Sequence, residues 1–581
     1  MVYYYSKNSY GRATRARFVR GKSMKEYLAA YREWKDSPFV DEQTRAELAA
    51  IEGDEAEIRA RFEHPMAFGT AGMRGVIGAG TGRMNRYVVR KATLGYAQYL
   101  KEQGEDAAKR GVIIAHDNRH MSREFCLETA GVLAAQGVQA YIFDGLRTTP
   151  ELSFAVRHCH AAGGVVITAS HNPPEYNGYK LYDENGCQLV PRYTDALSAI
   201  IDRIEDPLSI ESLTLDRAGD RIKVLGPEVD EAYYRAVMGI RLRPDVKKDD
   251  FSVVYSPQHG TGNIPVREVL ARCGYKVTPV EEQCFPDPDF INTKSPNPEN
   301  GEAYELAMTY AERMNADIAI TTDPDCDRLG VVAKRAGKFE LLSGNQSGAI
   351  LLNYILEYKK ANGILPANAV MCNTVVTSTL GDRVCEKYGV KVEKTLTGFK
   401  FIGDKIHTFE TDGSATYVFG YEESYGCLIA DFARDKDAVQ ASLMLCEAAA
   451  YYKTLGKTLW DVLEGLYDEF GYYLDKMTSV VHKGADGAAR IAALVDNIRK
   501  NPPARVDGIA VVAAEDYLSA EMQEKGFPPS NVLRFVLADN SWVAVRPSGT
   551  EPKCKYYYCV TGADRKTAEK KLSAMRKTFE G

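Results

Sequence analysis

Long apolar runs are missing from this sequence of 581 residues. No stretch reaches the roughly 18 consecutive apolar residues that a membrane-spanning helix needs, so we expect no transmembrane segment. An excess of basic residues is missing as well, because 73 lysines and arginines stand against 79 acidic residues and give a formal net charge of -6. Without an overall positive field, nucleic acid is not expected as a partner, although local basic pockets can still bind small anions.

Closely spaced cysteines are also absent. The twelve cysteines are scattered between Cys126 and Cys559 without a CxxC pair or regular spacing, which argues against a zinc site and against a disulfide framework. We therefore expect a protein of the reducing cytoplasm. What is present is an ordinary globular composition, 45% hydrophobic and 26% charged, in a chain long enough for about three or four domains.

The first 22 residues differ in composition from the rest. They carry six lysines or arginines and no acidic residue, but they lack the apolar stretch of a secretory signal. We predict a disordered extension over residues 1–23, followed by a helix that begins at Met24 in MKEYLAAYREW. We therefore hypothesise that the residues before Met24 are a non-native or mis-assigned start of the chain.

Alternating helical and strand patterns divide the rest of the chain into four units. Residues 24–225, 226–342 and 343–471 each place short β-rich apolar runs between amphipathic helices, which is typical of α/β domains. Residues 472–581 change to longer alternating strands closed by one amphipathic helix. We therefore predict an α/β protein with three similar mixed-sheet domains and a C-terminal α+β domain, packed around a central cleft.

A serine follows one of the predicted strands. The strand GGVVIT runs directly into ASHNP, which contains Ser170 and His171, and ligand sites of α/β proteins lie at this end of a strand. The hydroxyl of Ser170 is a candidate nucleophile, with His171 and Lys180 nearby in the sequence to activate it. An ordinary turn is the competing interpretation, because Asn and Pro are common in turns.

Three carboxylates alternate in a second loop. Asp323, Asp325 and Asp327 follow the strand ADIAITT in the sequence DPDCDR. Without a cation they would repel one another, whereas an oxygen-only cluster suits Mg²⁺ with substrate phosphate in its remaining positions. Arg328 adds a planar donor for a phosphoryl oxygen. A solvated acidic turn is the alternative.

An anion pocket is predicted in the fourth unit. Arg546, Ser548, Gly549, Thr550 and Lys553 follow a strand in SWVAVRPSGTEPK. A guanidinium fork, hydroxyl groups and close backbone N–H groups together suit a phosphate. A hairpin turn rich in Pro and Gly explains the motif equally well.

Two more loops are weaker candidates. GYEESYG offers Glu422, Glu423 and Ser424 as acceptors for sugar hydroxyls, and FGTAGMRG offers Arg74 for a phosphate. Surface position and loop flexibility explain both motifs when each is taken alone.

These loops together closely resemble the α-D-phosphohexomutase superfamily, in its phosphoglucomutase and phosphopentomutase branch. TASHNP resembles the phosphoserine loop of that family, DPDCDR its magnesium loop, GYEESYG its sugar-recognition loop and RPSGTEPK its phosphate-binding loop. The matches follow the family's order and extend over nearly the whole chain. They imply three topologically similar α/β domains and a C-terminal α+β domain, each contributing one loop to a shared cleft.

The resemblance also implies roles for individual residues. Ser170 would carry a phosphate, and Mg²⁺ would be bound by an oxygen of that phosphate together with Asp323, Asp325 and Asp327. Lys180 would be the general acid or base. The other matching positions are Arg74, His171 and Arg328 around the transferring group, Glu422 and Ser424 at the sugar, Lys400 and Arg119 in the cleft, and Arg546, Ser548, Gly549 and Thr550 at the distal phosphate.

The activity implied is that of a phosphoglucomutase. Such an enzyme interconverts glucose 1-phosphate and glucose 6-phosphate, with Mg²⁺ as cofactor and glucose 1,6-bisphosphate as activator and intermediate. We expect sugar phosphates as the partners, no nucleic acid or membrane partner, and a monomer or weak homodimer in the cytoplasm.

Several departures from the family leave the substrate open. The sugar loop begins GYEES rather than GGEES or GEMS, and Pro324 and Cys326 stand where many members carry glycine or a small residue. A phosphopentomutase for ribose or deoxyribose phosphates and a phosphomannomutase are therefore alternatives. A phosphatase that uses Asp323 as nucleophile is a more remote one, as is a non-catalytic binding protein descended from the family.

Overall fold

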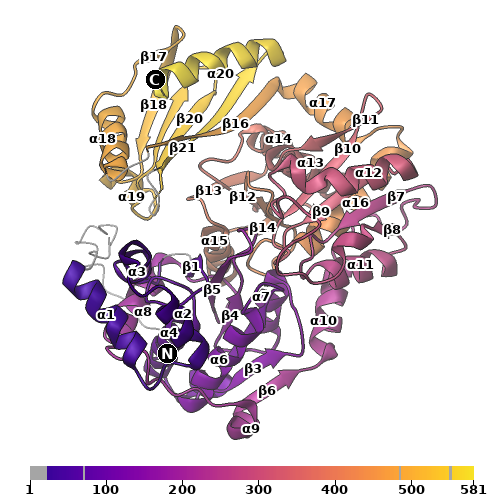
Figure 1. The fold of residues 1–581 in the computed structure, drawn as a ribbon. Helices are drawn as coiled ribbons and strands as arrows, with labels where there is room; N and C mark the ends of the chain where they lie inside the picture. Colours follow the sequence, from indigo (N-terminus) through magenta and orange to yellow (C-terminus); the bar gives the residue numbers. More distant parts are fainter. Residues whose placement is uncertain (1–22, 70–71, 483–485, 549–552, 581) are drawn as a thin grey trace.

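The computed structural model describes residues 23–69, 72–482, 486–548 and 553–580. Figure 1 shows four β-sheets with their helices, following one another in an arc from the indigo N-terminal part to the yellow C-terminal part. Of the predicted extension, residues 1–22 lie outside the described residues. Ser23 instead caps the first helix, because its N–H donates to Glu26 Oε2 at 2.6 Å.

The first sheet belongs to the N-terminal part of the chain, where three helices precede it. Trp34 of the first helix packs edge-on against Phe62 of the third helix and Tyr87 of the fourth. These contacts join the N-terminal helices to a helix that covers the sheet. The elements are α1 (Met24–Asp36), α2 (Glu42–Ala50), α3 (Glu55–Phe62), β1 (Met73–Val76), α4 (Arg86–Glu102), α5 (Glu105–Arg110), β2 (Val112–His116), α6 (Ser122–Ala135), β3 (Ala140–Phe143), α7 (Thr149–His158), β4 (Gly163–Ile167), β5 (Tyr176–Asp183), α8 (Pro191–Asp202), α9 (Leu215–Ala218) and β6 (Ile222–Leu225).

The order of this sheet is β1-β5-β4-β2-β3-β6. Strands β4, β2, β3 and β6 run parallel, and β5 runs antiparallel to both β4 and β1. Every residue of β2 and β4 is buried, as strands between two helical layers must be. The sequence pattern does not reveal β5, because this strand buries the polar side chains of Asn177 and Lys180.

The second and third sheets repeat this mixed pattern in the orders β11-β10-β9-β7-β8 and β13-β12-β14-β15. In each of them, the outer strand of a group of three parallel strands pairs with an antiparallel strand. Their elements are α10 (Pro227–Met238), β7 (Ser252–Ser256), α11 (Asn263–Arg272), β8 (Lys276–Pro279), α12 (Glu305–Met314), β9 (Ile318–Thr322), β10 (Leu329–Arg335), β11 (Lys338–Leu342), α13 (Gly344–Ala361), β12 (Ala369–Thr374), α14 (Leu380–Tyr388), β13 (Lys391–Thr395), α15 (Phe399–Asp412), β14 (Thr416–Tyr421), β15 (Cys427–Leu428), α16 (Ala438–Thr454) and α17 (Leu459–Phe470), with short 3₁₀ helices at Gly219–Arg221, Glu281–Gln283 and Gly301–Tyr304.

The fourth sheet is antiparallel throughout, in the order β16-β21-β20-β19-β18-β17. Together with the three mixed sheets, it confirms the predicted fold class. The elements of this part are β16 (Tyr472–Val481), α18 (Gly487–Lys500), β17 (Arg505–Val506), β18 (Ile509–Asp516), α19 (Ala520–Glu524), β19 (Leu533–Leu537), β20 (Trp542–Pro547), β21 (Lys553–Gly562) and α20 (Arg565–Phe579). The limits that we predicted between domains stay a prediction.

One topological position recurs in the three mixed sheets. The loop from β4 to β5 contains Ser170, the loop from β9 to β10 contains Asp323, and the loop from β14 to β15 contains Glu422. In each case a strand that pairs in parallel with its neighbour is joined to the antiparallel strand beside it. Three predicted functional loops therefore occupy equivalent places, at the carboxyl end of a parallel strand, where α/β proteins bind ligands.

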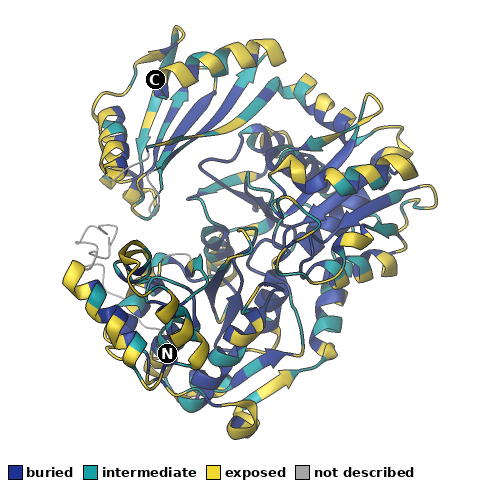
Figure 2. Cartoon of the chain, viewed as in Figure 1, coloured by how far each residue is buried: buried dark blue, intermediate teal, exposed yellow. Residues whose placement is uncertain are grey.

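The interior is continuous between the second and third sheets. One hydrophobic cluster includes residues from both and reaches Tyr473 and Trp542 of the fourth. Helix α16 is buried along nearly its whole length, and Figure 2 shows the dark blue of buried residues concentrated where these sheets meet. Among the described residues, no helix is both long enough and apolar enough to cross a membrane.

Candidate active site

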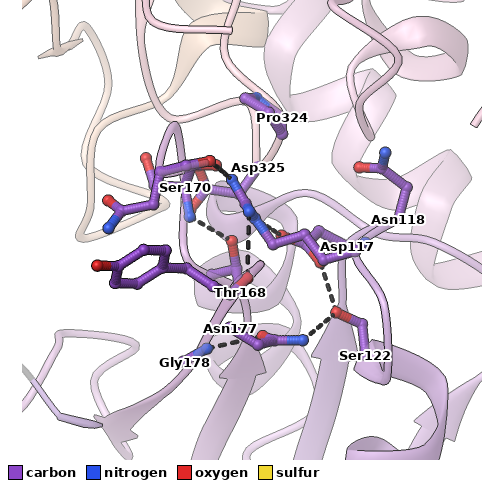
Figure 3. Close-up of polar contacts among 12 residues, drawn as sticks. Asp117, Asn118, Ser122, Thr168, Ser170, Asn177, Gly178, Pro324 and Asp325 are labelled. Carbon is purple, nitrogen blue, oxygen red and sulfur yellow. Dashed lines mark hydrogen bonds and ion pairs between the residues drawn. The ribbon is translucent and has the colours of Figure 1, made fainter. Parts of the chain in front are cut away.

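Ser170 lies in direct contact with the carboxylate loop of another sheet. Its Oγ donates to Asp323 Oδ2 at 2.7 Å and lies 3.2 Å from His171 Nδ1. The residue has a left-handed φ of 52°, and its N–H donates to Thr168 Oγ1 at 2.8 Å (Figure 3). A non-glycine residue rarely adopts this conformation, which costs roughly 1 kcal/mol. The fold therefore holds the hydroxyl at the carboxylates against a local conformational preference.

Arg119 lies beneath this loop instead of facing a ligand. Its guanidinium donates to four backbone carbonyls of the loop between Ser170 and Tyr176. Its Nε lies 3.4 Å from Asp117 Oδ2, and the side chain is 0% exposed. The donors of Arg119 all face protein groups in this geometry, and its predicted contact with substrate stays a prediction. The residue positions the loop that carries Ser170.

A buried polar chain supports Asp117 in turn. Ser122 Oγ donates to Asp117 Oδ1 at 2.6 Å, Asn177 Nδ2 donates to Ser122 Oγ at 2.9 Å, and Gly178 N–H donates to Asn177 Oδ1 at 2.7 Å. Figure 3 shows this chain below Ser170. It joins the end of β2 to β5, so two strands on either side of β4 fix the base of the serine loop.

The carboxylate loop is a tight connection between β9 and β10. The backbone N–H groups of Asp327 and Arg328 donate to Asp323 Oδ1 at 3.1 and 3.0 Å. Behind the loop, Thr261 N–H donates to Pro324 carbonyl at 2.8 Å. Glycine is required at Gly260, because a Cβ there would lie 2.4 Å from Pro324 Cα. The loop is thus supported from behind by the segment that follows β7.

The donor set of the three aspartates fits a divalent cation. One ligand oxygen from each of Asp323, Asp325 and Asp327 can be chosen so that all lie within 4.8 Å of one another. The Oδ1 atoms of Asp325 and Asp327 are buried and have no hydrogen-bond partner among the described residues. Their Oδ2 atoms are occupied, by Lys180 Nζ at 2.9 Å and by Lys436 Nζ at 3.1 Å respectively. A hard cation with oxygen ligands would satisfy the two buried orphan atoms.

The electrostatic interactions among these three carboxylates also favour a bound cation. Burial, together with the charges of Asp325 and Asp327, raises the pKa of Asp323 well above its ordinary value. Although burial opposes it, the Lys180 ammonium holds the pKa of Asp325 below its ordinary value. Crowded carboxylates of this kind are ionised together only when positive charge compensates them.

Three other predicted residues surround Ser170. Arg74, on β1, donates from Nη1 to Asn172 Oδ1 at 3.0 Å. Burial and the neighbouring Arg328 and Arg74 guanidinium groups lower the pKa of His171 well below its ordinary value, which favours the neutral imidazole. Arg328 donates to Glu299 Oε1 at 2.6 Å. The structure therefore brings Arg74, His171 and Arg328 together around the serine.

The predicted sugar loop adjoins the carboxylate loop, since Leu329 N–H donates to the Tyr425 carbonyl at 3.0 Å. Glu422 is buried and accepts from Gly398 N–H at 2.8 Å. Burial and the charge of Glu422 raise the pKa of Glu423 to about 7. Ser424 is half-buried in the same loop.

Lys400 and Arg546 connect this region to the fourth sheet. Burial, with a smaller contribution from the charge of Arg546, lowers the pKa of Lys400 to about 8, so Arg546 is close enough to act on it electrostatically. Ser548 N–H donates to the Lys553 carbonyl at 2.7 Å, which closes the turn between β20 and β21. Gly549 and Thr550, predicted to bind the distal phosphate, lie outside the described residues.

Several groups at the site were not predicted from the sequence. Lys555 is paired with Arg546 across β20 and β21, so both side chains project from the same face. Burial lowers the pKa of Lys555, although the nearby Glu299 and Glu423 carboxylates oppose this shift. Lys436 lies between Asp327 and Asp435, with Nζ at 3.1 and 3.0 Å from their oxygens. The sequence KYYYCV of β21 does not by itself show that Lys555 lies beside Arg546, because this depends on how β21 pairs with β20.

Known family models match four consecutive segments of the chain. They describe the alpha/beta/alpha domains I, II and III of phosphoglucomutase/phosphomannomutase, at residues 65–207, 231–337 and 343–470. The C-terminal domain of the same family matches residues 491–572. The chain belongs to this family. The predicted resemblance is thereby confirmed.

Two curated relatives of the family cover most of the chain. The phosphoglucomutase of Staphylococcus haemolyticus is 38% identical over 508 residues, which are 85% of this chain and 90% of the relative. The phosphoglucomutase of Staphylococcus aureus strain MRSA252 is 38% identical over 529 residues, 89% of this chain and 94% of the relative. The similarity therefore includes all four sheets.

Two solved structures share the fold. Parafusin, a phosphoglucomutase of Paramecium in its open form, gives a TM-score of 0.68 at 18% identity and covers 88% of this chain and 94% of its own. A phosphoglucomutase/phosphomannomutase family protein of Burkholderia thailandensis gives a TM-score of 0.65 at 19% identity, over 89% and 96%. At these identities they support the fold alone.

Proposed function

We propose that this member of the family interconverts glucose 1-phosphate and glucose 6-phosphate through a phosphate carried on Ser170. The observation that supports it most is the contact between Ser170 Oγ and Asp323 Oδ2 at 2.7 Å, within a cluster of three buried aspartates. The relatives named phosphoglucomutase, 38% identical over most of the chain, favour glucose phosphates over pentose or mannose phosphates.

The reaction has two phosphoryl transfers. In the first, the P–O bond to Ser170 breaks and a P–O bond to a free hydroxyl of the sugar monophosphate forms, which gives glucose 1,6-bisphosphate. After the bisphosphate has turned over in the site, its other phosphoryl group returns to Ser170 Oγ and the isomeric monophosphate leaves. Each transfer also moves one proton between the sugar hydroxyl and the serine oxygen, which is the task of a general acid or base.

We assign this proton transfer to Lys180. Its Nζ lies 2.9 Å from Asp325 Oδ2 and 3.8 Å from Asp327 Oδ2, on the strand that follows the serine loop. We propose that Arg74 and Arg328 bind the oxygens of the transferring group. Mg²⁺ bound by the three aspartates and a phosphate oxygen would neutralise charge that develops during transfer.

The fourth sheet is proposed to bind the phosphate that does not react. Arg546 and Lys555 project from one face of this sheet, and Ser548 follows Arg546 directly after the end of β20. Glu422 and Ser424 would accept from the sugar hydroxyls. We also propose that the enzyme works in the reducing cytoplasm, and the twelve free cysteines agree with this compartment. We propose a monomer or a weak homodimer as its oligomeric state.

A substrate panel tests the proposal. With Mg²⁺ and a trace of glucose 1,6-bisphosphate, we expect the 1-phosphates of mannose, ribose and N-acetylglucosamine to give kcat/KM at least about tenfold below glucose 1-phosphate. Production of each 6- or 5-phosphate is measured by a coupled assay. A preference for ribose 1-phosphate would instead make the chain a phosphopentomutase, and no isomerisation of any sugar would refute mutase activity.

Lys400 provides a test by pH. Burial lowers its pKa to about 8, so the ammonium is charged below that pH and loses its charge above it. If Lys400 binds the sugar phosphate, kcat/KM should fall by roughly tenfold per pH unit above a pH of about 8. In Lys400→Arg the decline should vanish, because the guanidinium stays charged.

Lys405→Arg on the same helix is the matched control for this pH profile. Lys405 pairs with Glu393 at 2.8 Å, so its replacement should leave the decline unchanged. Identical profiles for Lys400→Arg and the unmodified enzyme would contradict the phosphate-binding role.

A further inference from the structure

Thr149 makes two hydrogen bonds to the carboxylate loop of a different sheet. It is the first residue of α7, which packs on the first sheet. Its N–H donates to the Asp325 carbonyl at 2.9 Å, and its Oγ1 donates to Asp325 Oδ2 at 2.9 Å. Both residues are 0% exposed. One residue thus fixes the backbone and the side chain of Asp325 together.

The position of Thr149 is itself rigid. The preceding Thr148 caps α7, because its Oγ1 accepts from Glu151 N–H at 3.1 Å, and Pro150 fixes the backbone in the first turn. Threonine also has few side-chain rotamers, because it is branched at Cβ. The hydroxyl that reaches Asp325 therefore has little freedom to move.

The two oxygens of Asp325 are in different environments. Oδ2 accepts from Thr149 Oγ1 and from Lys180 Nζ, both at 2.9 Å. Oδ1 is buried without a hydrogen-bond partner among the described residues, and Asp325 belongs to the three-carboxylate cluster. With two donors on one oxygen, the carboxylate cannot rotate freely, and the other oxygen is left for a cation.

From this geometry we infer that Thr149 is a positioning residue for the metal site. It orients Asp325 and sets the carboxylate loop relative to the serine loop, because α7 and Ser170 belong to the same sheet's domain. Partners that hydrogen-bond a ligating carboxylate typically change metal affinity by 10–100-fold when they are removed. The inference rests on the proposed function for its metal, but not for the identity of the sugar.

Thr149→Val tests the inference, since it removes the hydroxyl and keeps shape and charge. Titration of Mg²⁺ alone into the full chain, followed by calorimetry, should give a dissociation constant about 10–100-fold higher than for the unmodified protein. The Mg²⁺ concentration for half-maximal activity should rise similarly, whereas KM for the sugar phosphate at saturating Mg²⁺ should not. Thr149→Ser, which retains the hydroxyl, should restore affinity to within about threefold.

Thr194→Val is the matched control. Thr194 is also buried in the first turn of a helix of this sheet, but within the described part of the chain its Oγ1 donates only to the Pro191 carbonyl of that turn, at 3.3 Å. Unchanged Mg²⁺ affinity in Thr149→Val, or an equal loss in Thr149→Ser or in Thr194→Val, would overturn the inference. If Thr149→Val does not fold, Thr149→Ala replaces it under the same criteria.

These results can be separated from failure of the proposed function. Calorimetry with Mg²⁺ alone needs no sugar phosphate, so it tests Thr149 even if the substrate panel finds no isomerisation. Absence of any Mg²⁺ binding by the unmodified chain would refute the metal site and the role of Thr149 together.

Discussion

Replacing Ser170 with alanine is expected to lower kcat for isomerisation by at least about 1,000-fold, with the fold intact. The hydroxyl is the proposed carrier, and no other hydroxyl in the described site contacts the carboxylate cluster except that of Thr149, which is committed to Asp325. Removal of a nucleophile costs more than removal of any single binding group. The measurement is initial rate with glucose 1-phosphate, Mg²⁺ and glucose 1,6-bisphosphate.

Mass analysis shows which residue is phosphorylated. Incubation with glucose 1,6-bisphosphate should add one phosphoryl group to the unmodified chain, mapped to the peptide of Ser170, and none to Ser170→Ala. Ser198→Ala is a suitable control, because Ser198 is half-buried and, among the described residues, its Oγ bonds only to the Phe68 and Thr194 carbonyls. Phosphate on Asp323 with none on Ser170 would favour the phosphatase alternative.

Removal of divalent metal is expected to have an effect of similar size. Chelation should reduce activity by at least about 1,000-fold, because the site would lose the charge that compensates three buried carboxylates and the transferring phosphoryl group. Re-addition of Mg²⁺ should restore it. The buried Oδ1 atoms of Asp325 and Asp327, which lack hydrogen-bond partners among the described residues, are the structural basis for this expectation.

The chelation experiment needs a control for unfolding. Circular dichroism before and after chelation should be unchanged, because Lys180 and Lys436 also pair with Asp325 and Asp327 and supply positive charge of their own. Full activity in excess chelator would contradict a metal-dependent mechanism. Loss of activity that Mg²⁺ does not reverse would point to damage instead.

The sequence alone determined which loops we propose to carry the chemistry. Ser170 and the three aspartates each follow an apolar strand, and the order of the four motifs resembles one family. These features are local: a strand, its end and the polar residues that follow it lie within a few positions, so pattern and chemistry can be recognised together. For the same reason the mixed sheets and the antiparallel fourth sheet could be predicted.

Contacts between distant segments could not be predicted in this way. Arg119 matches a position that the sequence assigned to substrate, yet it is buried under the serine loop and donates to that loop's carbonyls. Its guanidinium is suited to either role. Only the tertiary position of Asp117 and of the loop decides between them.

Thr149 and Lys555 illustrate the same limit. Nothing near Thr149 in TTPELS indicates a carboxylate 176 positions later, and Lys555 becomes a neighbour of Arg546 only through the register of β20 and β21. The sequence by itself thus determined which groups we propose to react, because each motif contains its own chemistry. The tertiary structure decided how those groups are oriented and neutralised, because hydrogen bonds and ion pairs act over a few ångströms in space, whatever the separation along the chain.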